Sequence, residues 1–262
     1  MSIRVGVIGA AGRMGATVCG AVHADESLEL VAAVDPTAVG RTVGDVGGPP
    51  AEVVIGPDVA SFVDAGVDVA VDFTVAAASR VNLPELAANG IHAVVGTTGF
   101  DDDDLAMFRG AFTSSNCVVA ANFAISAVLL MRFAELAAPF FDTAEIIEYH
   151  HNQKIDAPSG TAVATAQRLA AASTTWASDP TEKEVYEGAR GGAGPAGVRV
   201  HAVRMQGMLA HQDVILGAEG QTLTIRQDSY DRSSFMPGVV LACRRVGDHP
   251  GRTVGLEPIL EI

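Results

Sequence analysis

The feature that most limits how this chain can fold is a strand that runs directly into a glycine-rich turn. Residues Ile3–Ile8 are dominated by β-branched apolar side chains, which is typical of a parallel strand buried on both faces. The turn Gly9–Gly15, with the sequence GAAGRMG, follows at once, and a helical stretch continues to about His23. Strand, glycine turn and helix in this order are the setting of a dinucleotide-binding site.

The composition of the turn suits a pyrophosphate group. Glycines allow the backbone to approach phosphates closely, and the helix N-terminus adds free N–H groups and the positive end of the helix dipole. The spacing departs from G-x-G-x-x-G, because Ala10 occupies the first glycine position if Gly12 and Gly15 are the second and third. We predict a dinucleotide site here; a tight strand–helix turn that binds no ligand is the alternative.

Asp35 supports the dinucleotide interpretation and bears on the choice of cofactor. It follows the next predicted strand, Leu28–Val34, about 20 residues after Gly15, where a carboxylate accepts hydrogen bonds from the adenosine ribose. Its charge repels a 2′-phosphate and so favours NADH, whereas Arg13 can pair with such a phosphate. We expect NADH to be favoured, with some tolerance for NADPH.

Strand and helix signals alternate through the first half of the chain. The further predicted elements are strands Val67–Phe73, His92–Val95 and Val118–Ala121, a helix Ser79–Ala88 broken near Pro84, and a helix that begins in the acidic run Asp101–Asp104. Four carboxylates at the positive end of a helix dipole indicate a solvated helix start and not a metal site. The alternation predicts an α/β fold with a Rossmann-type, doubly wound parallel sheet.

The pattern changes after Asn122. The predicted elements there are helices Ile125–Ala138, Ser159–Ala172 and Ser233–Arg245, strands Glu145–His150, Val198–Met205, Gln212–Leu216, Thr222–Arg226 and Glu257–Ile262, and a glycine-rich loop Gly188–Gly197. Three successive strands without helices between them indicate an antiparallel or mixed sheet. We therefore expect a second domain, of the α+β class, with an open mixed sheet.

Composition excludes several classes of function. The net charge of −14 disfavours binding to nucleic acid or to anionic membranes. Cys19, Cys117 and Cys243 lie far apart in apolar runs, so we expect buried, reduced thiols and neither a disulfide framework nor a zinc site. The longest uncharged stretch, Gly110–Met131, is too polar for a membrane span, and the first apolar run is too short for a signal peptide. These features predict a cytoplasmic protein.

The segment Glu148–Ala162, EYHHNQKIDAPSGTA, carries the most chemical information. A histidine has an ordinary pKa near neutrality, so His150 suits a general acid, and Lys154 can donate a proton or attract an anion. Ser159–Thr161 at a helix start has the form of an anion cradle sized for a carboxylate. His150 and His151 would point to opposite faces of a strand, which disfavours a shared metal. We expect a small anionic substrate beside proton donors, and no metal; a structural role for one histidine is the alternative.

Two further strand ends are candidates for cofactor contacts. Gly96–Thr98 and Ala120–Phe123 each follow a predicted parallel strand, and ligands of open α/β sheets bind beyond the carboxyl ends of the strands. Backbone groups of both segments can contact the nicotinamide half of a dinucleotide. An ordinary turn is the alternative for each.

Five blocks of the sequence stand out together. They are GAAGRMG at Gly9–Gly15, DFT at Asp72–Thr74, VVGTTGF at Val94–Phe100, AANFAI at Ala120–Ile125 and EYHHNQKIDAPSGTA at Glu148–Ala162. In these blocks, and in their order along much of the chain, the sequence resembles the dihydrodipicolinate reductases, also called 4-hydroxy-tetrahydrodipicolinate reductases. The last block is highly specific for that family.

The resemblance implies an NAD(P)H-dependent oxidoreductase of the diaminopimelate route to lysine. The implied reaction reduces 4-hydroxy-tetrahydrodipicolinate to tetrahydrodipicolinate, with hydride passing from the nicotinamide to C4 of the ring and a proton added at the neighbouring carbon. The family organisation implies a Rossmann-type domain of residues 1–121 and 233–262. A substrate-binding and tetramerisation domain of residues 122–232 would be inserted between them.

The resemblance also assigns roles to individual residues. His150 would act as general acid or base and Lys154 as a proton donor. The substrate carboxylates would be bound by His151, Lys154, Ser159, Gly160 and Thr161. The cofactor would be bound by Gly9, Ala10, Ala11, Gly12, Arg13, Met14, Asp35, Gly96, Thr97, Thr98, Ala120, Ala121, Asn122 and Phe123. Pro36 stands where some family members carry an arginine, which weakens the case for strong NADPH use.

Two other readings remain open from the residues. A semialdehyde or homoserine dehydrogenase would also combine a nucleotide domain with an aspartate-derived substrate, but the phosphorylating semialdehyde enzymes need a nucleophilic cysteine at a helix start, where none of the three cysteines lies. A dinucleotide sensor without catalytic activity would not need His150 and Lys154 beside an anion cradle. An assay of NADH oxidation separates the sensor from the enzyme.

The expected second sheet also predicts self-association. The helices at 125–138 and 159–172 can cover one face, and apolar side chains such as Val200, Val203 or Ile215 would lie on the other. An exposed apolar sheet face usually marks an interface. Closed symmetry favours a dimer or a D2 tetramer, and the family resemblance favours the homotetramer.

Overall fold

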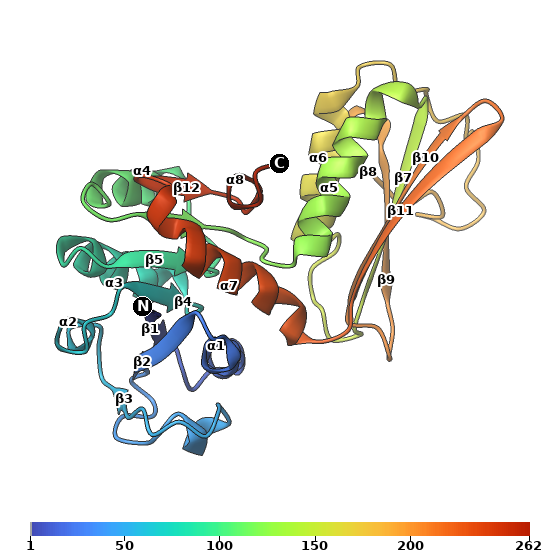
Figure 1. Cartoon of the computed structure of the whole chain (residues 1–262). Helices are drawn as coiled ribbons and strands as arrows, with labels where there is room; N and C mark the ends of the chain where they lie inside the picture. The colour runs from blue at the N-terminus through green and yellow to red at the C-terminus, as the bar shows by residue number, and fades with distance from the viewer. Residues whose placement is uncertain (1) are drawn as a thin grey trace. The chain divides into compact units, whose positions relative to one another are not determined.

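The polypeptide divides into two units, each built on its own β-sheet. A computed structural model describes residues 2–262 (Figure 1). The first unit comprises Met1–Phe123 and Arg232–Ile262, so it contains both ends of the chain, and the second comprises Ala124–Asp231. The sequence expectation placed these divisions after residues 121 and 232.

A seven-stranded sheet forms the centre of the first unit. Its order is β12-β6-β5-β4-β1-β2-β3, and every ladder in it is parallel. The strands are β1 (Ile3–Ile8), β2 (Leu28–Val34), β3 (Ile55–Gly56), β4 (Val69–Asp72), β5 (His92–Val95), β6 (Cys117–Val119) and β12 (Arg252–Val254). Strands β1 to β6 reproduce the order of a dinucleotide-binding Rossmann sheet, with β12 added beside β6. The predicted doubly wound parallel sheet is confirmed.

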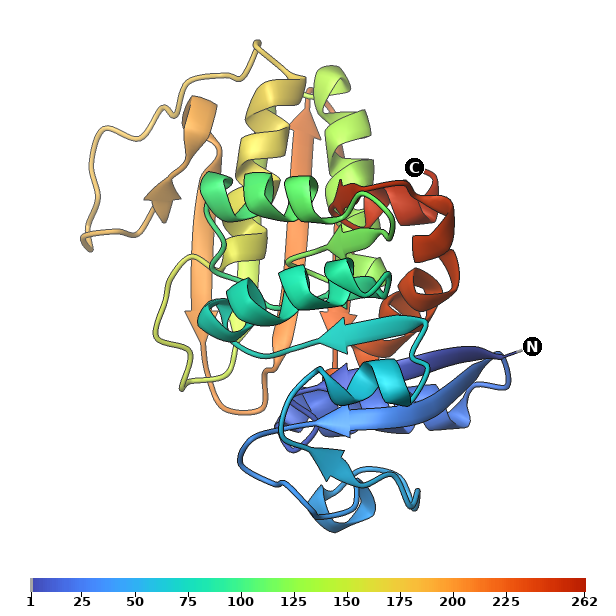
Figure 2. The ribbon, with the colours of Figure 1, turned by 90° about the vertical axis from the view of Figure 1, so that its left-hand side faces the viewer.

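Helices cover both faces of this sheet (Figure 2). On one face α1 (Arg13–Ala24) packs against α7 (Met236–Arg245), and on the other α3 (Ala76–Ala88) packs against α4 (Asp102–Ala111). The shorter elements are α2 (Ser61–Asp64), α8 (Glu257–Leu260), η1 (Gly44–Val46), η4 (Arg232–Phe235) and η5 (Val246–Asp248). Burial of apolar side chains from helices and strands, such as Leu83, Phe108 and Val95, forms the core on the α3–α4 side.

The second unit has a five-stranded mixed sheet with two helices on one face, as predicted. Its order is β11-β10-β7-β9-β8, in which only the β7–β9 ladder is parallel. The elements are α5 (Ile125–Ala137), η2 (Ala138–Phe140), β7 (Thr143–His150), α6 (Gly160–Ala172), β8 (Gly192–Ala193), η3 (Pro195–Gly197), β9 (Arg199–Arg204), β10 (Ala210–Ala218) and β11 (Gln221–Ser229). Helices α5 and α6 lie side by side over the sheet (Figure 1).

Strand register decides which side chains of this sheet face the helices. Val200 pairs with Ile146, and both are buried in the cluster beneath α5 and α6. The expectation that Val200 lies on the uncovered face is therefore wrong. Val203 pairs with Tyr149 and Ile215 with Glu145, and these side chains alternate with the buried ones along their strands. Val203 and Ile215 thus lie on the uncovered face, where they are partly exposed.

Other elements also differ from expectation. The C-terminal segment forms helix α8 instead of a strand, because Pro258 suits a first helical turn and the buried Ile259 anchors it; the sheet edge is β12. Helix α3 begins earlier and continues through Pro84, held by the buried Leu83 and Leu86 on either side. The glycine-rich loop contains the short elements β8 and η3. Within residues 2–262, no helix combines the length and apolarity needed for a membrane span.

The acidic start of α4 is more specific than a solvated run of carboxylates. Asp101 caps the helix by accepting a 2.9 Å hydrogen bond from the Asp104 N–H, and Asp104 accepts one in return from the Asp101 N–H. Asp104 is buried and forms a two-point ion pair with Arg80 of α3. The expectation of a solvated run is wrong for Asp104, which ties two helices together.

This arrangement predicts unequal effects of two similar substitutions in the same turn. Asp101→Ala removes the cap and should lower the free energy of unfolding by about 1 kcal/mol. Asp103→Ala removes an exposed carboxylate that favours the helix dipole only, and should cost less. Denaturant unfolding followed by circular dichroism measures both; an equal loss for the two variants would contradict the capping role.

Candidate functional site

The glycine turn after β1 forms a backbone cradle at the start of α1. Gly9 has a positive φ of 78°, and a side chain at Gly15 would place its Cβ only 2.0 Å from the Gly9 carbonyl oxygen. The turn therefore requires glycine at both positions. No side chain caps α1 at Gly12, and its first turn contains no acidic residue. Its amide groups and dipole are thus available to a phosphate group.

Asp35 closes one side of this cradle. Its Oδ2 accepts a 3.1 Å hydrogen bond from the Ala11 N–H, and its Oδ1 accepts hydrogen bonds from the Thr37 N–H and hydroxyl at 3.0 and 2.6 Å. The carboxylate is almost buried and borders a cavity of about 520 Å³. Gly9, Gly12, Asp35, Pro36 and Thr37 are among the residues that line the cavity. These residues fit the adenosine half of a dinucleotide.

The ends of β4, β5 and β6 lie along the same edge of the sheet as the cradle. Asp72, at the end of β4, accepts hydrogen bonds from the hydroxyls of Thr74, Ser79 and Thr97 at 2.6 to 3.0 Å. The Thr97 hydroxyl oxygen accepts in turn from the Thr74 N–H at 2.8 Å. The network fixes Thr97 beside the strand end while Thr98 remains exposed. The sequence did not predict Asp72 as the centre of these contacts.

The segment Ala120–Phe123 follows β6 at this edge. Ala120 and Phe123 are buried, and the Phe123 ring lies 5.8 Å from that of Phe73, which follows β4. Ala121 is exposed, and Asn122 is partly exposed. The structure therefore brings the predicted cofactor-binding segments to one edge of the first sheet. Arg13 lies exposed in the first turn of α1, and Met14 beside it is partly buried.

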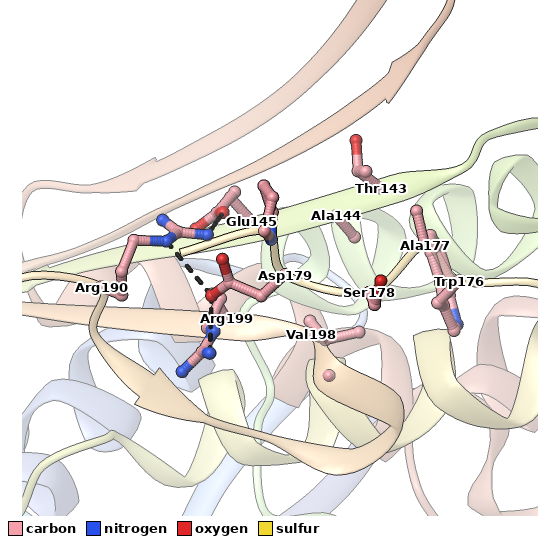
Figure 3. A pocket seen from close by; sticks show the side chains of 12 residues that line it. Thr143, Ala144, Glu145, Trp176, Ala177, Ser178, Asp179, Arg190, Val198 and Arg199 are labelled. Atoms are coloured by element: carbon pink, nitrogen blue, oxygen red, sulfur yellow. Dashed lines mark hydrogen bonds and ion pairs between the residues drawn. The ribbon is translucent and has the colours of Figure 1, made fainter. Parts of the chain in front are cut away.

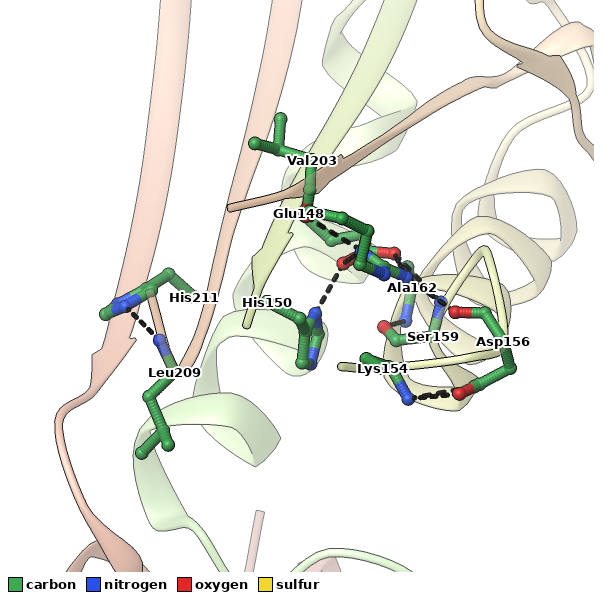
Figure 4. A network of polar contacts seen from close by, with 10 residues as sticks. Glu148, His150, Lys154, Asp156, Ser159, Ala162, Val203, Leu209 and His211 are labelled. Carbon is green, nitrogen blue, oxygen red and sulfur yellow. Dashed lines mark hydrogen bonds and ion pairs between the residues drawn. The ribbon is translucent and has the colours of Figure 1, made fainter. Parts of the chain in front are cut away.

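In the second unit, Glu148 and His150 form the centre of a polar network at the end of β7 (Figure 4). They are two residues apart on a strand, so their side chains share a face. His150 Nδ1 lies 2.5 Å from Glu148 Oε2, and Arg204 of β9 donates to both carboxylate oxygens at 2.8 and 2.7 Å. Neither Glu148 nor Arg204 was singled out from the sequence; strand alternation would have pointed to Glu148, but only the β7–β9 register brings in Arg204.

The ionisation of these groups follows from their surroundings. Burial alone would raise the pKa of Glu148, but hydrogen bonds from Arg204 and His150 outweigh it and hold that pKa below its ordinary value. Burial lowers the pKa of His150, and the charges of Lys154 and Arg204 act in the same direction, against the opposing effect of Glu148. Glu148 is therefore a carboxylate near neutral pH.

The remaining residues of the segment lie in the loop that leads to α6. Lys154 forms a two-point ion pair with Asp156, at 2.7 and 2.8 Å, and its side chain is partly exposed. His151 lies beyond the end of β7 and is exposed, so it does not share the strand geometry that the sequence suggested. Figure 4 shows Lys154 and His150 beside the same polar network.

The residues of the predicted anion cradle lie at the N-terminus of α6. The Ser159 hydroxyl caps the helix by accepting from the Ala162 N–H at 3.2 Å, and the Ser159 N–H donates to Glu148 Oε1 at 3.1 Å. Ser159 is buried, while Gly160 is exposed and Thr161 partly exposed at the helix start. The polar groups of Ser159 thus bind groups of the protein itself, whereas Gly160 and Thr161 lie at the surface of the helix N-terminus.

A smaller cavity in this unit is closed by ion pairs (Figure 3). Its volume is about 70 Å³. Arg190 donates to Glu145 at 2.7 Å and to Asp179 at 3.3 Å, and Arg199 pairs with Asp179 at 2.6 Å. The charges are matched within the cavity, and they fasten the segment before β8 to the sheet, so we interpret this cavity as structural.

Neither metal nor thiol chemistry has a centre among the residues that the structure describes. No three histidine, cysteine, aspartate or glutamate side chains are grouped there to hold a metal ion. The three cysteines are free and buried, and burial raises the pKa of Cys19 and Cys243 to about 12. Such thiols are poor nucleophiles, which argues against the semialdehyde dehydrogenase alternative.

Comparison with known proteins covers nearly the whole chain. Residues 3–123 match the family model for the N-terminus of dihydrodipicolinate reductase, and residues 126–260 match that for its C-terminus. The 4-hydroxy-tetrahydrodipicolinate reductase of Corynebacterium aurimucosum is 52% identical over 99% of both chains, and that of Nocardia farcinica is 48% identical over 100% of both.

Solved structures lead to the same family. A dipicolinate-bound dihydrodipicolinate reductase from Paenisporosarcina sp. TG-14 has a TM-score of 0.89 and 41% identity, over 99% of this chain and 100% of that one. An amine dehydrogenase from Mycobacterium smegmatis, with a TM-score of 0.68 and 15% identity over 98% of this chain and 96% of that one, shares the fold. The family resemblance of the sequence blocks is confirmed, and the chain belongs to the dihydrodipicolinate reductase family.

Proposed function

We propose that this chain reduces 4-hydroxy-tetrahydrodipicolinate to tetrahydrodipicolinate with NADH or NADPH, in the diaminopimelate route to lysine. The observation that carries the proposal is the Glu148–His150 pair beside the N-terminus of α6, in a chain of which 99% aligns with a curated reductase. An acid next to a carboxylate cradle suits the reduction of a cyclic dicarboxylate. Loss of NADH absorbance on addition of the substrate tests the activity, and binding of NADH without turnover would favour a sensor.

The first unit supports dinucleotide binding through its backbone. Gly9 to Met14 form the cradle for the pyrophosphate, and Asp35 faces the place of the adenosine ribose. Gly96–Thr98 and Ala120–Phe123 lie along the same sheet edge for the nicotinamide half. The bound cofactor supplies the hydride; the residues of the chain orient it and exclude water from the reacting atoms.

The second unit supports proton transfer and charge stabilisation. In its doubly protonated form His150 donates a proton from the ring nitrogen that is turned away from Glu148, and Lys154 supplies a second acidic group and a positive charge. Gly160 and Thr161 at the start of α6, with His151, bind the substrate carboxylates. A cation beside the ring stabilises the negative charge that develops as the substrate accepts hydride.

Removal of the acid groups should therefore affect catalysis more than cofactor binding. His150→Ala and Lys154→Ala are each expected to lower kcat at least ~100-fold, the low end of the effect of a positioned acid or base. NADH affinity, measured by fluorescence titration, should stay unchanged, because the cofactor contacts are in the other unit. A Lys154→Ala enzyme with near-normal kcat would contradict the role proposed for Lys154.

Cofactor preference follows from Asp35 and Pro36. Asp35 already accepts three hydrogen bonds, and its negative charge opposes a 2′-phosphate. We expect NADH to be used at least as well as NADPH, as judged by kcat/KM with each cofactor at one fixed substrate concentration. An advantage of more than ~100-fold for NADPH, which is about 3 kcal/mol of transition-state binding, would overturn this proposal.

We also propose a homotetramer in the cytoplasm. The uncovered face of the second sheet carries Ile147, Val203 and Ile215, which are only partly buried in one chain, and the free cysteines suit a reducing compartment. Light scattering at micromolar protein should give about four times the mass of one chain. The mass of a single chain, together with full activity, would show that assembly plays no part in function.

A further inference from the structure

Glu148 is a fully buried carboxylate whose hydrogen-bonding capacity is completely used. It is 0% exposed, and four donor groups point at its two oxygens. Oε1 faces Arg204 Nη2 at 2.7 Å and the Ser159 N–H at 3.1 Å, while Oε2 faces Arg204 Nη1 at 2.8 Å and His150 Nδ1 at 2.5 Å. A carboxylate offers about four lone-pair sites, so each of them has a donor.

The state of the His150 ring follows from this arrangement. A carboxylate accepts hydrogen bonds only, so the nitrogen that faces it must carry a proton. Nδ1 is that nitrogen, and Nε2 is left as the position that exchanges a proton with the substrate. The contact therefore selects one tautomer of the neutral ring and fixes the direction in which Nε2 points.

Glu148 also joins the end of β7 to the start of α6 and, through Arg204, to the distant strand β9. The Ser159 N–H, immediately before α6, donates to Glu148. Arg204 on β9 also donates a 2.7 Å hydrogen bond to the Asp156 carbonyl oxygen. One buried carboxylate thus holds the acid, the start of the anion-binding helix and the loop that carries Lys154 (Figure 4).

We propose that Glu148 is the positioning residue of this site, which sets the His150 tautomer and aligns the ring with the N-terminus of α6. The proposal rests on the proposed function, in which His150 is the acid. Glu148 acts through His150 and is not assigned a contact with substrate. The charged groups that act on the His150 ring are Glu148 on β7, Arg204 on β9 and Lys154 in the following loop.

The variant Glu148→Gln gives a specific test of tautomer selection. Its amide NH₂ takes the place of one of the two carboxylate oxygens, so it must face the two donors that this oxygen met. Arg204 and the Ser159 N–H cannot accept a hydrogen bond, whereas the His150 ring can, by moving its proton from Nδ1 to Nε2. We expect Glu148→Gln to convert neutral His150 to the Nε2–H tautomer.

Nitrogen-15 NMR of the imidazole ring reads the tautomer directly in the full-length protein, with the His150 signals assigned from their loss in His150→Gln. The wild type should show the Nδ1–H form and Glu148→Gln the Nε2–H form.

Loss of the adjacent negative charge in Glu148→Gln should also lower the His150 pKa, on the order of one pH unit. Because a general acid must be protonated, the alkaline fall in kcat should move to lower pH, and kcat should drop on the order of 100-fold with NADH affinity unchanged.

Glu145→Gln is the matched control. Glu145 lies on the same strand and also pairs with a histidine and an arginine, His201 at 2.6 Å and Arg190 at 2.7 Å, but on the opposite face of the sheet. The Glu145→Gln variant should have the same His150 tautomer, the same pH dependence of kcat and the same kcat as the wild type. Equal effects of the two variants would indicate general damage to the sheet and overturn the proposal.

The wild-type spectrum decides the matter even if Glu148→Gln does not fold. An Nε2–H tautomer in the wild type would overturn the proposal, as would a folded Glu148→Gln variant with an unchanged tautomer, His150 pKa and kcat. A different result would show that His150 is not the acid of the proposed function. The His150→Ala variant would then keep its activity, while the tautomer of His150 would still change in Glu148→Gln.

Discussion

The ion pair between Glu148 and Arg204 is the interaction on which the polar site of the second unit depends. Burial of a carboxylate is costly unless its charge is matched and its remaining hydrogen-bonding positions are filled. Arg204 supplies the charge and two of the donors, and His150 and the Ser159 N–H supply the others. The pair therefore offsets the cost of burying the carboxylate. The same contacts hold the ends of β7 and β9 and the start of α6 together in one site.

In the first unit, the candidate site is formed mainly by backbone groups and not by a network of side chains. No side chain caps α1 at Gly12, so the amide groups at its start and the positive end of the helix dipole are available to an anion. The close contact of Gly15 with Gly9 makes this geometry possible and excludes any side chain there. Asp35 is held by Ala11 and Thr37, so the carboxylate is oriented by the same turn that it borders.

Local sequence patterns predicted most of the elements, and they failed where packing overrides local preference. The strands Ile3–Ile8, Leu28–Val34 and His92–Val95 were predicted at their observed bounds because short apolar runs bounded by turn residues are typical of buried strands. Pro84 was expected to break a helix that buried leucines hold together. The final apolar residues suggested a strand, but Pro258 begins a helix there and β12 takes the place beside β6.

The sequence by itself determined which candidate site residues the chain contains. One group is the glycine turn with Asp35, and the other is the family block with His150, Lys154 and Ser159–Thr161. Both can be found from local patterns in the sequence. The tertiary structure alone decided how these groups are held. Arg204 reaches Glu148 only because β9 pairs in parallel with β7, and Val200 turns inward for the same reason. The register between β7 and β9 depends on which face each strand buries in the assembled sheet, so the residues of one strand alone do not determine it.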